Sequence, residues 1–441
     1  MAERYRITGR TASEIAGSVE RLVAKGEIPP GARLPTVRDL AARAGVAPAT
    51  VAAAYRELAR RGITEGAGRL GTRVRDAAPL PVVPHAPLPP GVFDLVDGGP
   101  DPALLPPLGP VLRRARPSRA GYGEGPVLPA LSDVARGALE ADGIPVTRVA
   151  VVSGALDGVE RVLRAHLRVG DRVAVEDPGF ASVHDLVAAL GMRRTPVGVD
   201  DDGPQPDSLE RALRDGARAV VVTPRAQNPT GAAIGADRAR ALRTVLRAHP
   251  DVVVVEDDHA GAIAGAPGTT LVDARRARWA VVRSVAKALG PDLRVAMLTA
   301  DATTIDRVEG AQRVGPGWVS WLLQEIVADL LCDRATQRLL DRAAATYARR
   351  RDALVGALGR HGIASHARSG LNVWIPVPAE ATVVSALLVS GWGVSAGERF
   401  RIASAPAIRV NVARLAPDDA RRLADDLAGA LGAPGARATS R

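Results

Sequence analysis

The sequence predicts an α/β protein in two parts: a small helical head that ends in a hairpin, and a large domain built on a mainly parallel sheet. Three observations support this fold class. The chain has 441 residues, too many for one ordinary core. Residues 77–91 contain six prolines and divide the chain. Beyond residue 93, short β-branched runs alternate with long helical patterns rich in Ala, Leu and Arg, which is typical of βαβ units.

The head, residues 1–76, is expected to hold three helices and a two-stranded wing. Thr36 suits the cap of the second helix because an acid, Asp39, follows three residues later. Pro48 suits the first position of the third helix, where its missing N–H is not needed. The helices are expected over residues 13–24, 36–44 and from 48 onward, and the wing strands at 63–64 and 72–74 around a glycine-rich loop.

The proline-rich segment 77–91 is expected to form a semi-rigid polyproline II spacer of about 3 Å per residue. It separates the head from a domain over residues 92–441, whose smaller α+β C-terminal subdomain begins at about residue 336. Strands of this domain are expected at residues 149–152, 172–175, 219–223, 252–256, 280–282, 371–375 and 407–412.

The net charge of +10 is concentrated in the head. Residues 1–76 contain fourteen Lys and Arg against eight Asp and Glu, a net charge of +6 (14 − 8). A compact basic domain favours a polyanionic partner, with nucleic acid first. The alternative is a genome that prefers arginine, because only two of the 58 basic residues are lysines, Lys25 and Lys287.

Composition also disfavours several classes of protein. Cys332 is the single cysteine, which excludes an internal disulfide and a cysteine-based zinc site. No apolar run approaches the length of about 18 residues that a membrane helix needs. The polar, basic N-terminus lacks the apolar centre of a signal peptide. We therefore expect a cytoplasmic protein without a metal centre.

The third helix of a winged helix-turn-helix lies in the major groove of DNA, and arginines contact phosphates and guanines. The alternative is a winged helix used only for protein contacts. The expected contacts with double-stranded DNA come from Arg33, Thr36, Arg38, Pro48, Ala49, Thr50, Arg69, Gly71, Thr72 and Arg73.

Three stretches of the head carry a more specific signal: residues 30–41 (PGARLPTVRDLA), 45–51 (GVAPATV) and 71–74 (GTRV). They resemble the GntR-type winged helix of DNA-binding regulators. One departure is Ala47, where the family usually has a Ser or Thr cap. This change weakens the start of the helix by about 1 kcal/mol.

In the large domain, the residues around Lys287 predict a chemical role for its amine. It follows the expected strand 280–282, and Arg294 comes seven residues later. A lysine amine forms an imine with an aldehyde. Ser284 and Arg294 are suited to hold a phosphate, the arginine through a charge-assisted fork. For Lys25, we favour the ordinary interpretation, a solvated surface charge.

Two more residues suit an aromatic aldehyde cofactor. Asp257 follows the apolar strand 252–256, and its carboxylate can pair with a protonated pyridine nitrogen. An acid at a strand end more often caps a loop or a helix. Asn228 lies in the sequence TPRAQNPTG, and its amide can donate to a phenolic oxygen. By itself, Asn-Pro-Thr-Gly indicates only a turn.

Phosphate and ring contacts are expected after two other strands. Residues 153–156 open a helix, so that the backbone N–H groups there would cradle a phosphate. Phe180 comes just after the strand at 172–175 and suits stacking on a flat ring, with core packing as the alternative.

Together these motifs resemble the fold-type-I aminotransferase pattern, over residues from about 93 to 431. The resemblance implies bound pyridoxal 5′-phosphate (PLP), with Lys287 carrying the internal aldimine, Asp257 at the ring nitrogen and Asn228 at the phenolic oxygen. The other implied roles are Phe180 on the ring face; Ser284, Arg294, Ala155 and Leu156 around the phosphate; Tyr122 at a phosphate of the neighbouring subunit; and Arg409 on a substrate α-carboxylate.

His259 departs from this pattern, which usually has a tyrosine beside the phenolic oxygen. A histidine also donates a hydrogen bond, but it is expected to titrate near neutrality. The departure argues against efficient transamination.

A GntR-type head, a proline-rich linker and an aminotransferase-like domain, in that order, resemble the MocR/GabR group of regulators. The resemblance implies a homodimer that binds DNA and senses an amino acid, an amine or PLP itself through Lys287. Two alternatives remain open: an aminotransferase with an appended DNA-binding head, and a DNA-binding protein whose large domain needs no cofactor.

Overall fold

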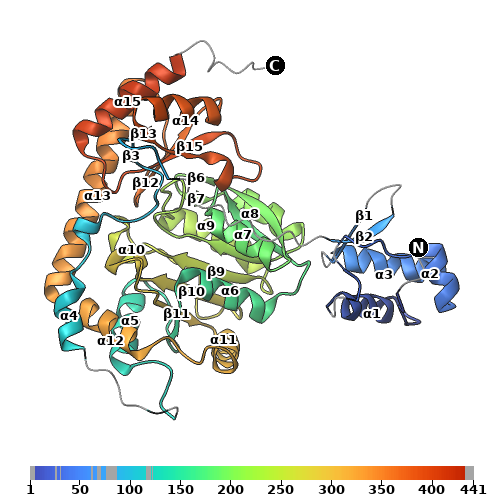
Figure 1. Ribbon diagram of the computed structural model, residues 1–441. Coiled ribbons are helices and arrows are strands. Elements are labelled where there is room, and N and C mark those ends of the chain that lie inside the picture. The colour runs from blue at the N-terminus through green and yellow to red at the C-terminus, as the bar shows by residue number, and fades with distance from the viewer. Residues whose placement is uncertain are drawn as a thin grey trace. The chain divides into compact units, whose positions relative to one another are not determined.

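The computed structural model describes residues 5–24, 27–29, 31–60, 63–66, 71–75, 87–115, 121 and 123–432 (Figure 1). The chain forms two compact units. Within the described residues, no helix combines the length and apolar character needed to cross a membrane.

The head contains three helices and an antiparallel hairpin, as the sequence predicts. Its elements are α1 (Ala12–Ala24), α2 (Val37–Ala44), α3 (Pro48–Arg60), β1 (Thr64–Gly66) and β2 (Thr72–Val74). Thr36 caps α2 by accepting a hydrogen bond from the backbone N–H of Asp39 at 3.2 Å. Gly45 ends the helix at a φ of 64°, in the left-handed region that favours glycine. The buried faces of α1 and α3 and the hairpin residue Val74 enclose a separate small core.

An eight-stranded sheet lies at the centre of the large domain. Its strands are β4 (Ala150–Val152), β5 (Arg172–Asp177), β6 (Arg193–Asp200), β7 (Gly203–Pro204), β8 (Ala217–Val222), β9 (Val253–Asp258), β10 (Trp279–Ser284) and β11 (Ala296–Ala300). Their order is β4-β11-β10-β9-β8-β5-β6-β7. Strands β8, β9 and β10 pair in parallel, while β11 runs antiparallel to β10 and β4. The carboxyl ends of β8, β9 and β10 therefore lie along one edge, where open α/β sheets bind ligands.

Helices accompany this sheet in the large domain. They are α4 (Leu108–Arg114), α5 (Pro129–Ala141), α6 (Ala155–His166), α7 (Ala181–Ala189), α8 (Pro206–Arg214), α9 (Ala236–Ala248), α10 (Ala286–Leu289), α11 (Ala302–Val314) and α12 (Trp321–Cys332), with short 3-10 turns η2 (Pro102–Leu104) and η3 (Gly261–Ile263). Gly158 lets α6 approach β10, because a Cβ there would lie 2.7 Å from a methyl group of Val282. This approach brings the start of α6 close to the end of β10.

The C-terminal region forms a smaller α+β subdomain, as predicted. It contains α13 (Arg334–Arg360), β12 (Asn372–Pro376), α14 (Glu380–Val389), β13 (Trp392–Gly393), β14 (Ser395–Ala396), η4 (Gly397–Phe400), β15 (Ala407–Asn411) and α15 (Pro417–Gly432). A three-stranded antiparallel sheet has the order β12-β15-β14. The short strand β3 (Phe93–Asp94) pairs with β13, so the chain enters the large domain through this subdomain. Figure 1 shows α13 in orange and α14 and α15 in red around these strands.

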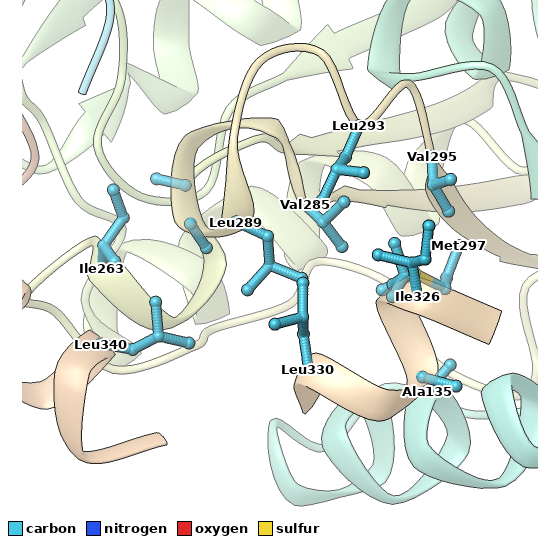
Figure 2. Packing of buried hydrophobic residues seen from close by; sticks show 14 of the residues in the cluster. Ala135, Ile263, Val285, Leu289, Leu293, Val295, Met297, Ile326, Leu330 and Leu340 are labelled. Carbon is cyan, nitrogen blue, oxygen red and sulfur yellow. The ribbon is translucent and has the colours of Figure 1, made fainter. Parts of the chain in front are cut away.

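The segment that follows β10 is anchored by apolar packing. Val285, Leu289 and Leu293 are buried in a cluster that also contains Ile326 and Leu330 of α12. Figure 2 shows the α12 side chains pointing toward this segment. The packing fixes the backbone on both sides of residue 287.

Two strands run further than the sequence predicted. The expected strand at 252–256 continues as β9 to Asp258, and the expected strand at 280–282 continues as β10 to Ser284. The extension occurs because β9 and β10 stay paired in parallel as far as Arg283 and Asp258. Asp257 therefore lies within a strand and not after one.

Candidate cofactor and DNA-binding sites

Asp257 is buried at the carboxyl end of β9, at 2% exposure. Its Oδ1 has no hydrogen-bond partner among the described residues. Burial, reinforced by the charge of Asp258, raises the pKa of Asp257 to about 7. A buried carboxylate oxygen without a partner is costly, which makes it an acceptor that awaits a donor.

Lys287 lies on the one-turn helix α10, three residues beyond the end of β10. Its Nζ donates a hydrogen bond to the carbonyl oxygen of Gly98. Burial, together with the nearby charge of Arg409, lowers the pKa of Lys287. A lowered pKa increases the share of neutral amine, which is the form that attacks an aldehyde.

His259 follows β9 directly. Burial, followed by the charge of Lys287, lowers its pKa to about 4. The prediction that His259 titrates near neutrality was therefore wrong. The cause is desolvation, which disfavours the charged imidazolium. At neutral pH His259 is a neutral hydrogen-bonding group.

The residues expected to hold a phosphate come together. The Arg294 guanidinium reaches the start of α6, where its Nη2 donates to the carbonyl oxygen of Ser153 at 3.4 Å. Gly154 leaves room for it, because a Cβ at that position would lie 2.4 Å from Nη2. Ser284 ends β10, and Ala155 and Leu156 open α6. A helix N-terminus beside an arginine is a suitable site for an anion.

Asn228 and Arg409 are hydrogen-bonded to each other. Nη1 of Arg409, on β15, donates to Oδ1 of Asn228 at 3.3 Å. Arg409 is 5% exposed, and its guanidinium lies 4.8 Å from the ring centre of Phe400. Burial lowers the pKa of Arg409 to about 10, so it stays charged at neutral pH. Arg409 is thus a buried cation at the junction of the large domain's sheet and its C-terminal subdomain.

Phe180 is half-buried just before α7.

Asp177, three residues before Phe180, has a structural role that the sequence analysis did not predict. The Asp177 carboxylate accepts hydrogen bonds from the backbone N–H groups of Ile402, Ala403 and Ser404 at 2.8–3.0 Å. It therefore ties the end of β5 to the C-terminal subdomain. A lone acid after a strand gives no signal of such a distant contact.

A buried network of ions was also missed. Asp258 accepts hydrogen bonds from Arg225 at 2.8 and 3.0 Å and from Arg283 at 2.7 Å. Asp142 bridges the same two arginines. These charges hold the pKa of Asp258 at about 2. Arg225 stands three residues before Asn228, so the network joins the loop of Asn228 to the strand of Asp257.

The expected DNA contacts lie on one end of the head's helices and on the wing. Arg38, Pro48 and Ala49 are exposed, and Thr50 is half-buried. Arg33 pairs with Arg73 in an isolated antiparallel bridge beside the wing, which places Gly71, Thr72 and both arginines together. The Thr36 hydroxyl is engaged as the cap of α2. Tyr122 and Arg69 lie outside the described residues.

Comparison with known proteins identifies both parts of the chain. Residues 11–74 match bacterial regulatory proteins of the gntR family, and residues 111–427 match aminotransferase class I and II. The chain is 40% identical to the vitamin B6 salvage pathway transcriptional repressor PtsJ of Salmonella typhimurium, over 96% of this chain and 99% of that one. It is 28% identical to the pyridoxine biosynthesis transcriptional regulator PdxR of Corynebacterium glutamicum, over 79% and 78% of the two chains.

Solved structures show the same fold for the large domain. The kynurenine aminotransferase of Pyrococcus horikoshii superposes with a TM-score of 0.70 at 20% identity, over 77% of this chain and 91% of that one. LysN, the α-aminoadipate aminotransferase of Thermus thermophilus, gives 0.67 at 22% identity, over 78% and 92%. Together, the gntR-type DNA-binding head and the aminotransferase fold show that the chain belongs to the MocR-type family of PLP-binding transcriptional regulators.

Proposed function

We propose that this protein holds PLP at Lys287 and that PLP occupancy controls its binding to DNA. The observation that supports the site is the buried Oδ1 of Asp257, which has no hydrogen-bond partner among the described residues. A protonated pyridine nitrogen is the donor that such an oxygen lacks, and PLP supplies a ring that can withdraw electrons.

The proposed site assigns one or more residues to each polar group of the cofactor and to its ring. Lys287 would hold the cofactor through its aldehyde group, which reacts with a neutral amine. Asn228 and His259 would donate to the phenolic oxygen, and Phe180 would cover one face of the ring. Phosphate would be held by Ser284, Arg294 and the amides of Ala155 and Leu156, with Tyr122 contributed to a neighbouring subunit.

The signal that we favour is vitamin B6 itself. Two relatives are named for vitamin B6 salvage and pyridoxine biosynthesis, and a regulator of such genes needs to measure their product. Arg409 also makes an amino acid a candidate ligand, because its buried guanidinium suits a carboxylate. We propose that the protein acts in the cytoplasm as a homodimer.

The first experiment is a titration of the purified full chain with PLP, followed by visible absorption, with Lys287→Ala as the control. We expect a visible band in the native protein and none in the variant. The same two proteins are then tested on duplexes selected from a random DNA pool. PLP should change the DNA affinity of the native protein by about tenfold and leave that of Lys287→Ala unchanged. A band without any effect on DNA binding would contradict the proposal.

Transamination is measured in the same preparation. Loss of the band with an amino acid, restored repeatedly by 2-oxoglutarate, would identify an enzyme and replace the sensor interpretation. We expect no sustained turnover, because His259 stands where catalytic relatives of this fold usually have tyrosine.

A further inference from the structure

Four residues, Val96–Gly99, cross the candidate site between two fixed points; we name this segment the strap. Before it, Leu95 is hydrogen-bonded to Gly393 of β13 at 2.9 Å and to Asn411 of β15 at 3.0 Å. After it, the backbone N–H of Asp101 donates to the Tyr347 hydroxyl at 3.1 Å, on α13. The strap is therefore held at its ends and is free of β-pairing in between.

The carbonyl groups of the strap bind the cations of the site. The Val96 carbonyl accepts a hydrogen bond from Nη2 of Arg409, and the Gly98 carbonyl accepts one from Nζ of Lys287. The Gly99 carbonyl lies 3.5 Å from Nδ2 of Asn411. A main-chain segment thus occupies the two groups to which we assign an aldehyde and a carboxylate.

The strap also fits closely. A Cβ on Gly98 would lie 3.4 Å from Nη1 of Arg409, so the backbone rests directly on the guanidinium. Asp97 adds a negative charge that favours the charged forms of both Lys287 and Arg409. Nε of Arg409 is buried without a partner among the described residues. The strap therefore leaves one hydrogen-bond donor of Arg409 unsatisfied. A carboxylate that binds in a bidentate manner would satisfy the guanidinium more completely.

We propose that the strap is a built-in competitor for Arg409 and thereby determines which ligands the site accepts. A cofactor held at Lys287 would take the place of the Gly98 contact only. A ligand that also carries a carboxylate has to displace the Val96 carbonyl from Arg409 and so releases the strap. This inference rests on the proposed function only for the identity of the bound ligand.

The strap lies close in sequence to the expected linker. Only Val92, Phe93, Asp94 and Leu95 separate Gly91, the last residue of the expected linker, from the strap. Amines without a carboxylate would leave the strap in place, whereas amino acids would release it. The strap would thus distinguish the two ligand classes.

Hydrogen–deuterium exchange of the full chain tests the strap in two arms. The first arm uses ligand-free protein. Arg409→Gln should exchange at least fivefold faster than the native protein in peptides over residues 94–100, because the Val96 anchor is lost. Arg368→Gln, an exposed arginine elsewhere in the large domain, is the matched control and should have no effect. Asp97→Asn should accelerate exchange about threefold, and the exposed Asp251→Asn should not.

The second arm uses native protein loaded with PLP and two probes that differ by one carboxylate, L-alanine and ethylamine. L-alanine should accelerate strap exchange at least fivefold, and ethylamine less than twofold. The proposal that the strap competes for Arg409 would be overturned by unchanged exchange in both Arg409→Gln and Asp97→Asn, or by equal effects of the two probes. Absence of a Lys287-dependent visible band would instead count against PLP binding. The ligand-free arm would still test whether the strap is anchored by Arg409.

Discussion

At Asp257, burial opposes the charge that its proposed role requires. The carboxyl has an ordinary pKa of 3.8 in the unfolded chain and about 7 in the folded one. A proton is therefore held more tightly in the folded state, and stability falls as the pH rises between these two values. A cationic ring nitrogen would reverse this effect, because it stabilises the ionised carboxylate.

Asp257→Asn should consequently stabilise the ligand-free protein while weakening PLP binding. The gain should grow from pH 4 to pH 7 and then level off, because each pKa unit corresponds to about 1.4 kcal/mol. Thermal unfolding of both proteins across pH 4–8 measures the gain, and the visible band measures PLP affinity, which we expect to fall at least tenfold. A variant that binds PLP as tightly as the native protein would refute the role of Asp257.

His259 should act at the acidic end of the range. Its pKa is 6.5 in the unfolded chain and about 4 in the folded one, so the unfolded state binds the proton more tightly. The resulting loss of stability develops as the pH falls from about 6.5 to 4. His259→Phe removes that loss, and its melting temperature relative to native should rise across this interval. The exposed His361→Phe is the control, and a parallel shift in both variants would argue against desolvation of His259.

Among the elements, β9 and the loop at residues 223–231 depend on the buried network of Asp142, Arg225, Asp258 and Arg283. Parallel pairing places Asp258 beside Arg283, and Arg225 reaches the same carboxylate from the neighbouring loop. Removing one partner leaves a buried charge uncompensated, which is strongly destabilising. The network thus secures the elements that carry Asp257 and Asn228.

Arg225→Met should lower the free energy of unfolding of the large domain by about 3–5 kcal/mol. Arg148→Met, which breaks an exposed ion pair with Asp306, should cost less than about 1 kcal/mol. Urea denaturation followed by far-ultraviolet circular dichroism compares the two. Equal and small effects would show that the buried pairs contribute little beyond their desolvation.

At the scale of the whole molecule, exposed leucines on two packed helices favour the proposed homodimer. Leu112 of α4 is 52% exposed and Leu322 of α12 is 37% exposed, and these two helices pack together. Trp318 and Trp321 stack nearby in sequence, with ring centres 4.9 Å apart. Large exposed apolar side chains on neighbouring helices are typical of surfaces between subunits.

Leu112→Asp combined with Leu322→Asp should convert the dimer to monomers at micromolar concentration. Val389→Asp changes an equally apolar side chain, 90% exposed on α14, and should leave the dimer intact. Light scattering coupled to size-exclusion chromatography measures the mass of each. Because Tyr122 is expected to reach the neighbouring subunit, the monomer should also bind PLP more weakly. A dimeric double variant would place the interface elsewhere.

The sequence by itself determined the two-part organisation, the winged helix of the head and the residues of the cofactor motif. These features are local, because caps, turns, strand periodicity and short motifs depend on residues that are close in sequence. Thr36 could be assigned as a cap from its immediate neighbours alone. The neighbours of Lys287 likewise predicted an imine lysine.

Only the tertiary structure decided what surrounds those residues. The low pKa of His259 results from burial, which no single motif encodes. Asp258 looks in sequence like a second copy of Asp257, yet pairing of β9 with β10 places it beside Arg283, and Arg225 reaches it from the loop after β8. Asp257 Oδ1 has no partner among the described residues. The strap meets Lys287 across 189 residues and Arg409 across 313, because strand pairing with the C-terminal subdomain brings distant segments together.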